Sequence, residues 1–161
     1  MSISNHMDLP LFRDGFQHEI LPYPVQAPEI KSGSEYYFET SSGLRYQVLF
    51  AKKKNSYLEN IVNFSVLSEE FEDEYSETNR GEIYKVIASV VEIIYLYHSH
   101  HAYSTSYEFS GEFKKGNDDR EISIRTLLYC RKAKEIMHPA WDIEISGNKV
   151  VVRRKKQRKI N

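Results

Sequence analysis

Hydrophobic and polar positions alternate with a period of two in the first half of the chain. The segments 35–40, 44–50 and 61–67 each alternate apolar with polar residues, as half-buried strands do. Ser41, Ser42 and Gly43 separate the first two segments and are typical of a hairpin turn. This pattern predicts three consecutive antiparallel strands.

After these strands the period of the pattern lengthens to three or four residues. The rest of the chain predicts, in order, a helix at 82–97, a strand at 105–109, a helix at 120–136 that Pro139 stops, and a hairpin at 141–154. The order β-β-β-α-β-α-β-β predicts an α+β fold, a mostly antiparallel sheet of about five to six strands with two helices packed on one face.

The length of 161 residues is that of one domain. Because prolines recur in the first thirty residues, we expect 1–33 to be an extended arm, with at most a short edge strand near 17–21. Residues 34–154 then form the α+β domain, and 155–161 form a basic C-terminal tail.

The net charge of −1 hides an uneven distribution of charged residues. Acidic residues crowd the segment 69–77, which we expect to be a solvated loop that can pair with the tail. The single cysteine, Cys130, excludes an internal disulfide, and no apolar run has the length of a membrane span. With no secretory signal at the N-terminus, these features favour the cytoplasm and no membrane partner.

Basic residues suggest one candidate site. A cluster near the predicted hairpin and the C-terminal residues supply the cations Lys52, Lys53, Lys54, Arg153, Arg154, Lys155, Lys156, Arg158 and Lys159. Clustered cations bind nucleic-acid phosphates, and the chain also has twelve tyrosines on which bases can stack. The alternative is that these cations only keep the surface solvated.

Histidine and arginine residues suggest a second, catalytic candidate. His98, His101, Arg120, Arg125 and Tyr129 resemble in type the set of a metal-independent ribonuclease, in which His exchanges protons and Arg stabilises phosphorane charge. Against this, Arg125 also fits a structural anchor beside Tyr129. His98 and His101 share a helical face, but no third ligand stands at a recognisable spacing, so we predict no metal site and no cofactor.

The second half of the chain carries a resemblance. Arg125-Thr126-Leu127-Leu128-Tyr129 at the second helix, with the closing strand Lys149 to Arg154, resembles an uncharacterised family of small proteins, mainly from Bacteroidetes bacteria. That family usually has Ser-Arg-Thr-x-Leu-Tyr there, and Ile124 replaces the Ser. The resemblance spans about residues 80–155 and implies a fold and a bacterial origin, but no established activity.

The leading hypothesis is therefore a small non-enzymatic binding protein that acts through a macromolecular partner, either another protein or a second copy of itself. The resemblance places it in a bacterial accessory system, such as toxin–antitoxin or phage defence. A small metal-independent ribonuclease is the alternative from another functional class. Nucleic-acid binding through the basic residues is the third hypothesis.

Overall fold

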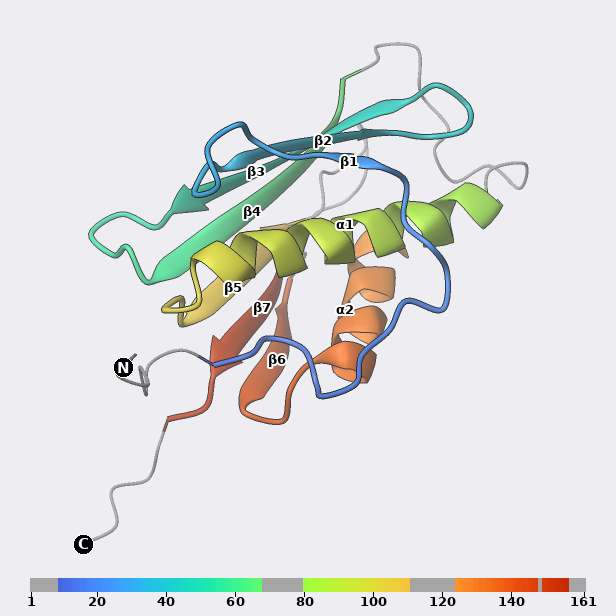
Figure 1. Cartoon of the computed structure of the whole chain (residues 1–161). Coiled ribbons are helices and arrows are strands. Elements are labelled where there is room, and N and C mark those ends of the chain that lie inside the picture. The colour runs from blue at the N-terminus through green and yellow to red at the C-terminus, as the bar shows by residue number, and fades with distance from the viewer. Residues whose placement is uncertain (1–8, 68–79, 111–123, 148, 157–161) are drawn as a thin grey trace, which may run out of the picture.

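A seven-stranded sheet carries both helices on one face (Figure 1). The computed structural model describes residues 9–67, 80–110, 124–147 and 149–156. Its elements are β1 (Val25–Gln26), β2 (Glu35–Glu39), β3 (Arg45–Lys52), β4 (Glu59–Val66), α1 (Arg80–His100), β5 (Ser106–Ser110), α2 (Ile124–Ile136), β6 (Trp141–Ser146) and β7 (Lys149–Arg154). The strand order across the sheet is β1-β2-β3-β4-β5-β7-β6.

The predicted α+β class and the mostly antiparallel sheet are confirmed. Every neighbouring pair of strands is antiparallel except β4 and β5, which run parallel because α1 connects them. Pairing of Glu39 with Arg45 closes the β2–β3 hairpin. Gly43 adopts a φ of 88° in its turn, a conformation that favours glycine.

The predicted strand count of five to six is too low. The additional strand is β1, where Val25 pairs with Phe38 and Gln26 with Tyr37. The sequence had favoured the segment 17–21 for a short edge strand, and the structure has no strand there. Two residues between prolines carry no periodic pattern, which is why this strand escaped prediction.

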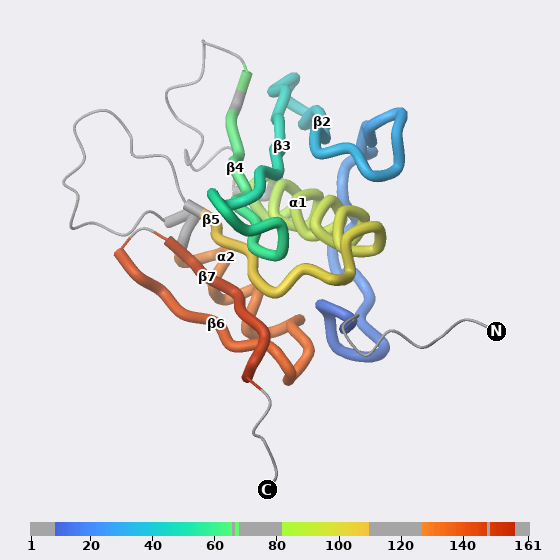
Figure 2. The backbone as a smooth tube through the Cα atoms, turned by 90° about the vertical axis from the view of Figure 1, so that its left-hand side faces the viewer, coloured from blue at the N-terminus to red at the C-terminus, as the bar shows by residue number. Residues whose placement is uncertain are grey.

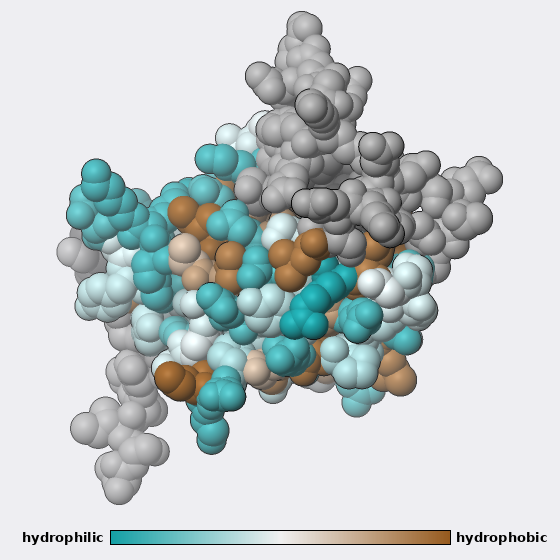
Figure 3. All heavy atoms as spheres, turned by 90° about the horizontal axis from the view of Figure 1, so that it is seen from above, coloured by the Kyte–Doolittle hydropathy of each residue, from teal (hydrophilic) through white to brown (hydrophobic). Residues whose placement is uncertain are grey.

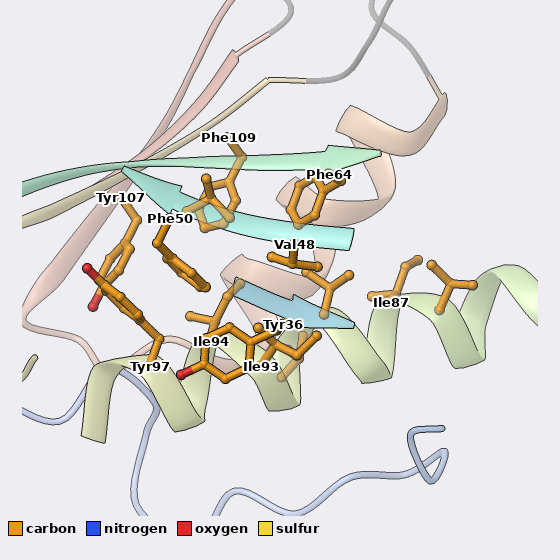
Figure 4. Close-up of a cluster of buried hydrophobic side chains, with 14 of the residues drawn as sticks. Tyr36, Val48, Phe50, Phe64, Ile87, Ile93, Ile94, Tyr97, Tyr107 and Phe109 are labelled. Carbon is orange, nitrogen blue, oxygen red and sulfur yellow. The ribbon is translucent and has the colours of Figure 1, made fainter. Parts of the chain in front are cut away.

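Helix α1 packs its apolar stripe against the inner face of the sheet. Val90 and Ile93 are almost completely buried, and Figure 4 shows Ile93 and Ile94 among side chains from the strands. Phe50 of β3 stacks on Tyr97 of α1 at a ring-centroid distance of 3.8 Å. These contacts stabilise a helix whose β-branched residues give it only moderate intrinsic propensity.

The opposite face of the sheet has no helix on it in the described residues. Seen from above in Figure 3, this side mixes hydrophilic and hydrophobic residues. The alternation in β3 explains the difference, because Tyr46, Val48 and Phe50 are buried beneath it while Arg45 and Ala51 are exposed. An antiparallel sheet with one covered face produces this pattern.

The N-terminal arm runs across α1 (Figure 1) and adds to the core. Leu11, Phe12 and Tyr23 are buried. The amide of Tyr23 donates to the hydroxyl of Ser89 on α1, at 2.8 Å. The indole of Trp141 donates to the carbonyl of Pro10, at 3.0 Å. The arm therefore ties α1 to the start of β6.

Helix α2 lies beside α1 and packs on β6 and β7. Cys130, Ala133 and Ile136 form its buried side. Cys130 is therefore a packing residue. The helix is described from Ile124 onwards, and the predicted beginning at 120–123 lies outside the described residues.

Candidate functional site

The two described basic segments lie at the same end of the sheet. Lys52 at the end of β3 pairs with Asn60, Asn60 with Tyr107, and Tyr107 with Val152, which precedes Arg153 at the end of β7. Three strand spacings of about 4.8 Å separate Lys52 from β7. We call this region the basic end, consisting of Lys52, Lys53, Lys54, Arg153, Arg154, Lys155 and Lys156.

The last turn of α1 and the β3–β4 loop share this end (Figure 1). The part of Figure 3 in which that loop lies, on the left, is largely hydrophilic. Tyr57 of the loop is 72% exposed, and its ring meets the ring of Tyr103 edge to face at 6.4 Å. Cations and an accessible aromatic ring thus occur side by side.

Asn60 is the centre of a buried hydrogen-bond network beneath the basic end. Its side-chain oxygen accepts from the amine of Lys52 at 2.8 Å and from the hydroxyl of Tyr97 at 2.9 Å. Its side-chain nitrogen donates to the carbonyl of Ser106 at 3.1 Å. Because Asn60 is completely buried, these bonds replace the water that the amide loses on folding.

Aromatic rings surround the amine of Lys52. It lies 5.0 Å from the ring centroid of Tyr103 and 5.7 Å from that of Tyr97, both within cation–π range. Burial lowers the pKa of Lys52. Burial also raises the pKa of Tyr97, and the neighbouring Tyr103 adds to that effect. Asn60 and the two rings therefore hold Lys52 in a defined position.

Other cations of the basic end differ in their partners. Lys53 lies 3.4 Å from a carboxylate oxygen of Glu108, and Lys155 lies 3.8 Å from one of Asp142. Within the described ranges, no carboxylate lies within 4.0 Å of the charged groups of Lys54, Arg153 or Lys156. These last cations are the ones best placed to meet an external anion.

Arg154 anchors the end of β7. Its guanidinium lies 5.4 Å from the ring centroid of Trp141 and donates to the carbonyl of Ala102 in the α1–β5 loop. The amide of Arg154 donates to the carbonyl of Thr105. Arg154 therefore fixes the loop after α1 against the end of β7.

The histidines predicted as proton-transfer groups are both buried. His98 lies within hydrogen-bond distance of the Tyr107 hydroxyl through Nδ1, at 2.6 Å, and of the Leu9 carbonyl through Nε2, at 2.7 Å. His101 bonds the carbonyl of Tyr97 through Nδ1 and stacks on the Tyr97 ring at 3.9 Å. Both rings thus have structural roles in fixing the end of α1.

Of the other members of the predicted ribonuclease set, the structure describes only the side chain of Tyr129, which does not lie beside these histidines. Tyr129 stacks on Phe64, four positions along β4 from Asn60, and so lies towards the other end of that strand. Arg120 lies outside the described residues, and Arg125 is described only in its backbone. The ribonuclease set stays a prediction.

Two of the predicted nucleic-acid-binding residues also lie outside the described residues. Arg158 and Lys159 of the tail lie outside the described residues, as does the acidic segment 69–77. The described residues contain no group of three or more His, Cys, Asp or Glu side chains arranged to hold a metal ion. Neither described helix has the length and apolar character needed to cross a bilayer.

Comparison with known proteins gives no family. The chain matches no family model, no curated protein and no solved structure. The resemblance to the Bacteroidetes family therefore stays a prediction.

Sequence reasoning identified the cations of this end but missed the residues that hold them. Asn60, Tyr97, Tyr57 and Tyr103 were not among the predicted site residues. A signal for Asn60 was present, because it shares the inward phase of β4 with Val62 and Phe64. A polar side chain at an inward position needs hydrogen-bond partners inside the protein, and Lys52 and Tyr97 are two of the partners of Asn60.

His101 makes the stability of this region sensitive to acid. Burial lowers the pKa of His101, the charge of Lys52 lowers it further, and the bond to the Tyr97 carbonyl opposes both. Since the unfolded imidazole binds a proton at about pH 6.5, the unfolded state gains protons first as the pH falls below that value. We expect the free energy of unfolding to decrease from pH 7 downwards until the folded His101 also titrates.

The variant His101→Phe tests this expectation, because it keeps a ring on Tyr97 and removes the titration. Urea unfolding at pH 7 and pH 5 should show a smaller loss of stability on acidification for His101→Phe than for the wild type. An equal loss in both proteins would show that His101 does not cause the acid sensitivity.

Proposed function

We propose that this chain is a non-enzymatic binding protein whose macromolecular partner is a single-stranded nucleic acid, bound at the basic end of the sheet. One observation carries the proposal. Lys52–Lys54 and Arg153–Lys156, a hundred positions apart in the sequence, meet at the same end of four adjacent strands. Cations from separate segments thus form one surface.

The side chains of this surface suit both the phosphate and the base of a nucleotide. Lys54, Arg153 and Lys156 are exposed and have no close carboxylate among the described residues, so they are available to phosphates. Tyr57 offers an exposed ring for stacking on an unpaired base. Stacking requires a base outside a duplex, which favours single strands over double strands.

Salt dependence tests the proposal. Fluorescence anisotropy with a labelled oligonucleotide of mixed sequence should show affinity that falls steeply as salt rises. The triple variant Lys54→Ala/Arg153→Ala/Lys156→Ala should lower the slope of log K against log salt by about two units, since each phosphate contact on a single strand adds about 0.7. Binding should weaken for all sequences alike.

A matched variant removes three cations from elsewhere. Arg45 lies at the opposite end of β3, and Arg131 and Lys134 lie on α2. The variant Arg45→Ala/Arg131→Ala/Lys134→Ala has the same net charge as the first and should keep most of the wild-type slope. Equal slopes in the two variants would contradict binding at the basic end.

The ribonuclease hypothesis predicts a different result with the same reagents. Purified protein would cleave single-stranded RNA in the presence of EDTA, with a bell-shaped pH profile, and His101→Ala or Arg125→Ala would abolish cleavage. Our proposal expects the RNA to remain intact. The predicted bacterial toxin–antitoxin or phage-defence context is tested by the neighbouring genes.

A further inference from the structure

The two edges of the sheet are unequal. At one edge, β1 has two residues and lies between Pro24 and Pro28, so it offers little backbone for pairing. At the other edge, β6 has six residues, about 20 Å of extended chain. Among the described strands, only β7 pairs with β6 (Figure 2). Within the part of the chain that the structure describes, the outer side of β6 therefore has no strand partner.

The side chains of β6 differ on its two faces. Asp142 and Glu144 are exposed on the face away from the helices. Ile143 and Ile145 lie on the other face, the latter 39% exposed. The strand contains no proline and no lysine, the residues that commonly prevent pairing at an exposed edge.

We infer that the outer edge of β6 binds an extended segment of a partner protein, in which apolar residues alternate with Lys or Arg. Main-chain hydrogen bonds would join the segment to the sheet, as in other cases of strand addition. Its apolar side chains would cover Ile143 and Ile145, and its cations would lie beside Asp142 and Glu144.

The strand on the inner side of β6 has the same alternation of cationic and apolar residues. There, β7 places Arg153 opposite Asp142 and Val152 opposite Ile143. A second strand with the same alternation would repeat that register on the outer side. A second copy of β6 is a poor partner, because antiparallel pairing would bring carboxylates of the two copies together, and like charges side by side destabilise a sheet.

A synthetic peptide tests the inference. The probe is the N-terminally labelled peptide Lys-Val-Lys-Val-Lys-Val, and binding is followed by fluorescence anisotropy and by amide hydrogen exchange. We expect saturable binding and slower exchange of the amides of β6. Two peptides with the same charge serve as controls, Lys-Lys-Lys-Val-Val-Val and the probe with every peptide nitrogen methylated. Both should bind at least about tenfold more weakly.

A charge-reversed protein gives a second readout. Asp142 and Glu144 are exposed, so Asp142→Lys/Glu144→Lys should fold normally. This variant should lose affinity for the lysine peptide and gain affinity for Glu-Val-Glu-Val-Glu-Val. Equal binding of the control peptides, no binding of the probe at millimolar concentration, or dimerisation through β6 in sedimentation measurements would each overturn the inference.

Discussion

Replacing Val90 with Asp is expected to unfold the domain. Val90 is 1% exposed and lies in the stripe of α1 that faces the sheet. An unpaired carboxylate there would cost more than about 4 kcal/mol, a large part of the roughly 5–15 kcal/mol that stabilises a typical domain. Circular dichroism and thermal melting would show loss of the cooperative transition.

Tyr84→Asp is the matched control on the same helix. Tyr84 is 51% exposed, so its replacement introduces the same charge without burying it. We expect a change in stability within about 1 kcal/mol. A Val90→Asp protein with the melting temperature of the wild type would show that this face of α1 is not part of the core.

Asn60→Leu should have the largest effect of any substitution at the basic end. Leucine has a similar volume but leaves the Tyr97 hydroxyl and the Ser106 carbonyl without the partner that Asn60 gave them. Each buried unsatisfied group costs about 1–3 kcal/mol, so we expect a loss of about 2–4 kcal/mol in urea unfolding. Lys52 is exposed, so in this variant its amine can bind water in place of Asn60.

A second substitution separates the two losses. In Asn60→Leu/Tyr97→Phe the buried hydroxyl is removed together with its acceptor. Because removing both partners costs less than leaving one unsatisfied, the double variant should be less destabilised than the sum of the two single variants. Simple additivity would mean that the Tyr97–Asn60 bond does not stabilise the folded protein.

The parts of the fold that the sequence predicted are those with a repeating pattern. Ile83, Ile87 and Ile94 recur at helical spacing, and α1 contains all three. The alternation around Ser41–Gly43 predicted the β2–β3 hairpin, whose register the structure shows. In both cases one element buries a single face, so local spacing carries the information.

Features that depend on distant partners could not be read in this way. The buried Leu11, Phe12 and Tyr23 stand among prolines without a period, and only their partners on α1 and after α2 make them core residues. The parallel pairing of β4 with β5 likewise depends on how α1 crosses the sheet. Spacing along the chain says little about such contacts.

The candidate site was predicted in part for the same reason. Charge clusters are visible in a sequence, so Lys52–Lys54 and Arg153–Lys156 were identified. Their meeting at one end depends on the order β3-β4-β5-β7, which no local signal specifies. Lys52 and Asn60 could have been noticed in the sequence, because each is a polar residue at an inward position, and the other inward positions of its strand are apolar or aromatic.

The hydrogen bond that joins the N-terminal arm to the beginning of β6 has a consequence for biosynthesis. The bond from Trp141 to Pro10 joins residues 131 positions apart. The arm is synthesised before β6, so the carbonyl of Pro10 has its donor only after Trp141 has been synthesised. Contacts with such long sequence separation slow folding. During translation this part of the arm therefore lacks one of its contacts until β6 is made, and a chaperone that binds exposed apolar segments has time to bind Leu11 there.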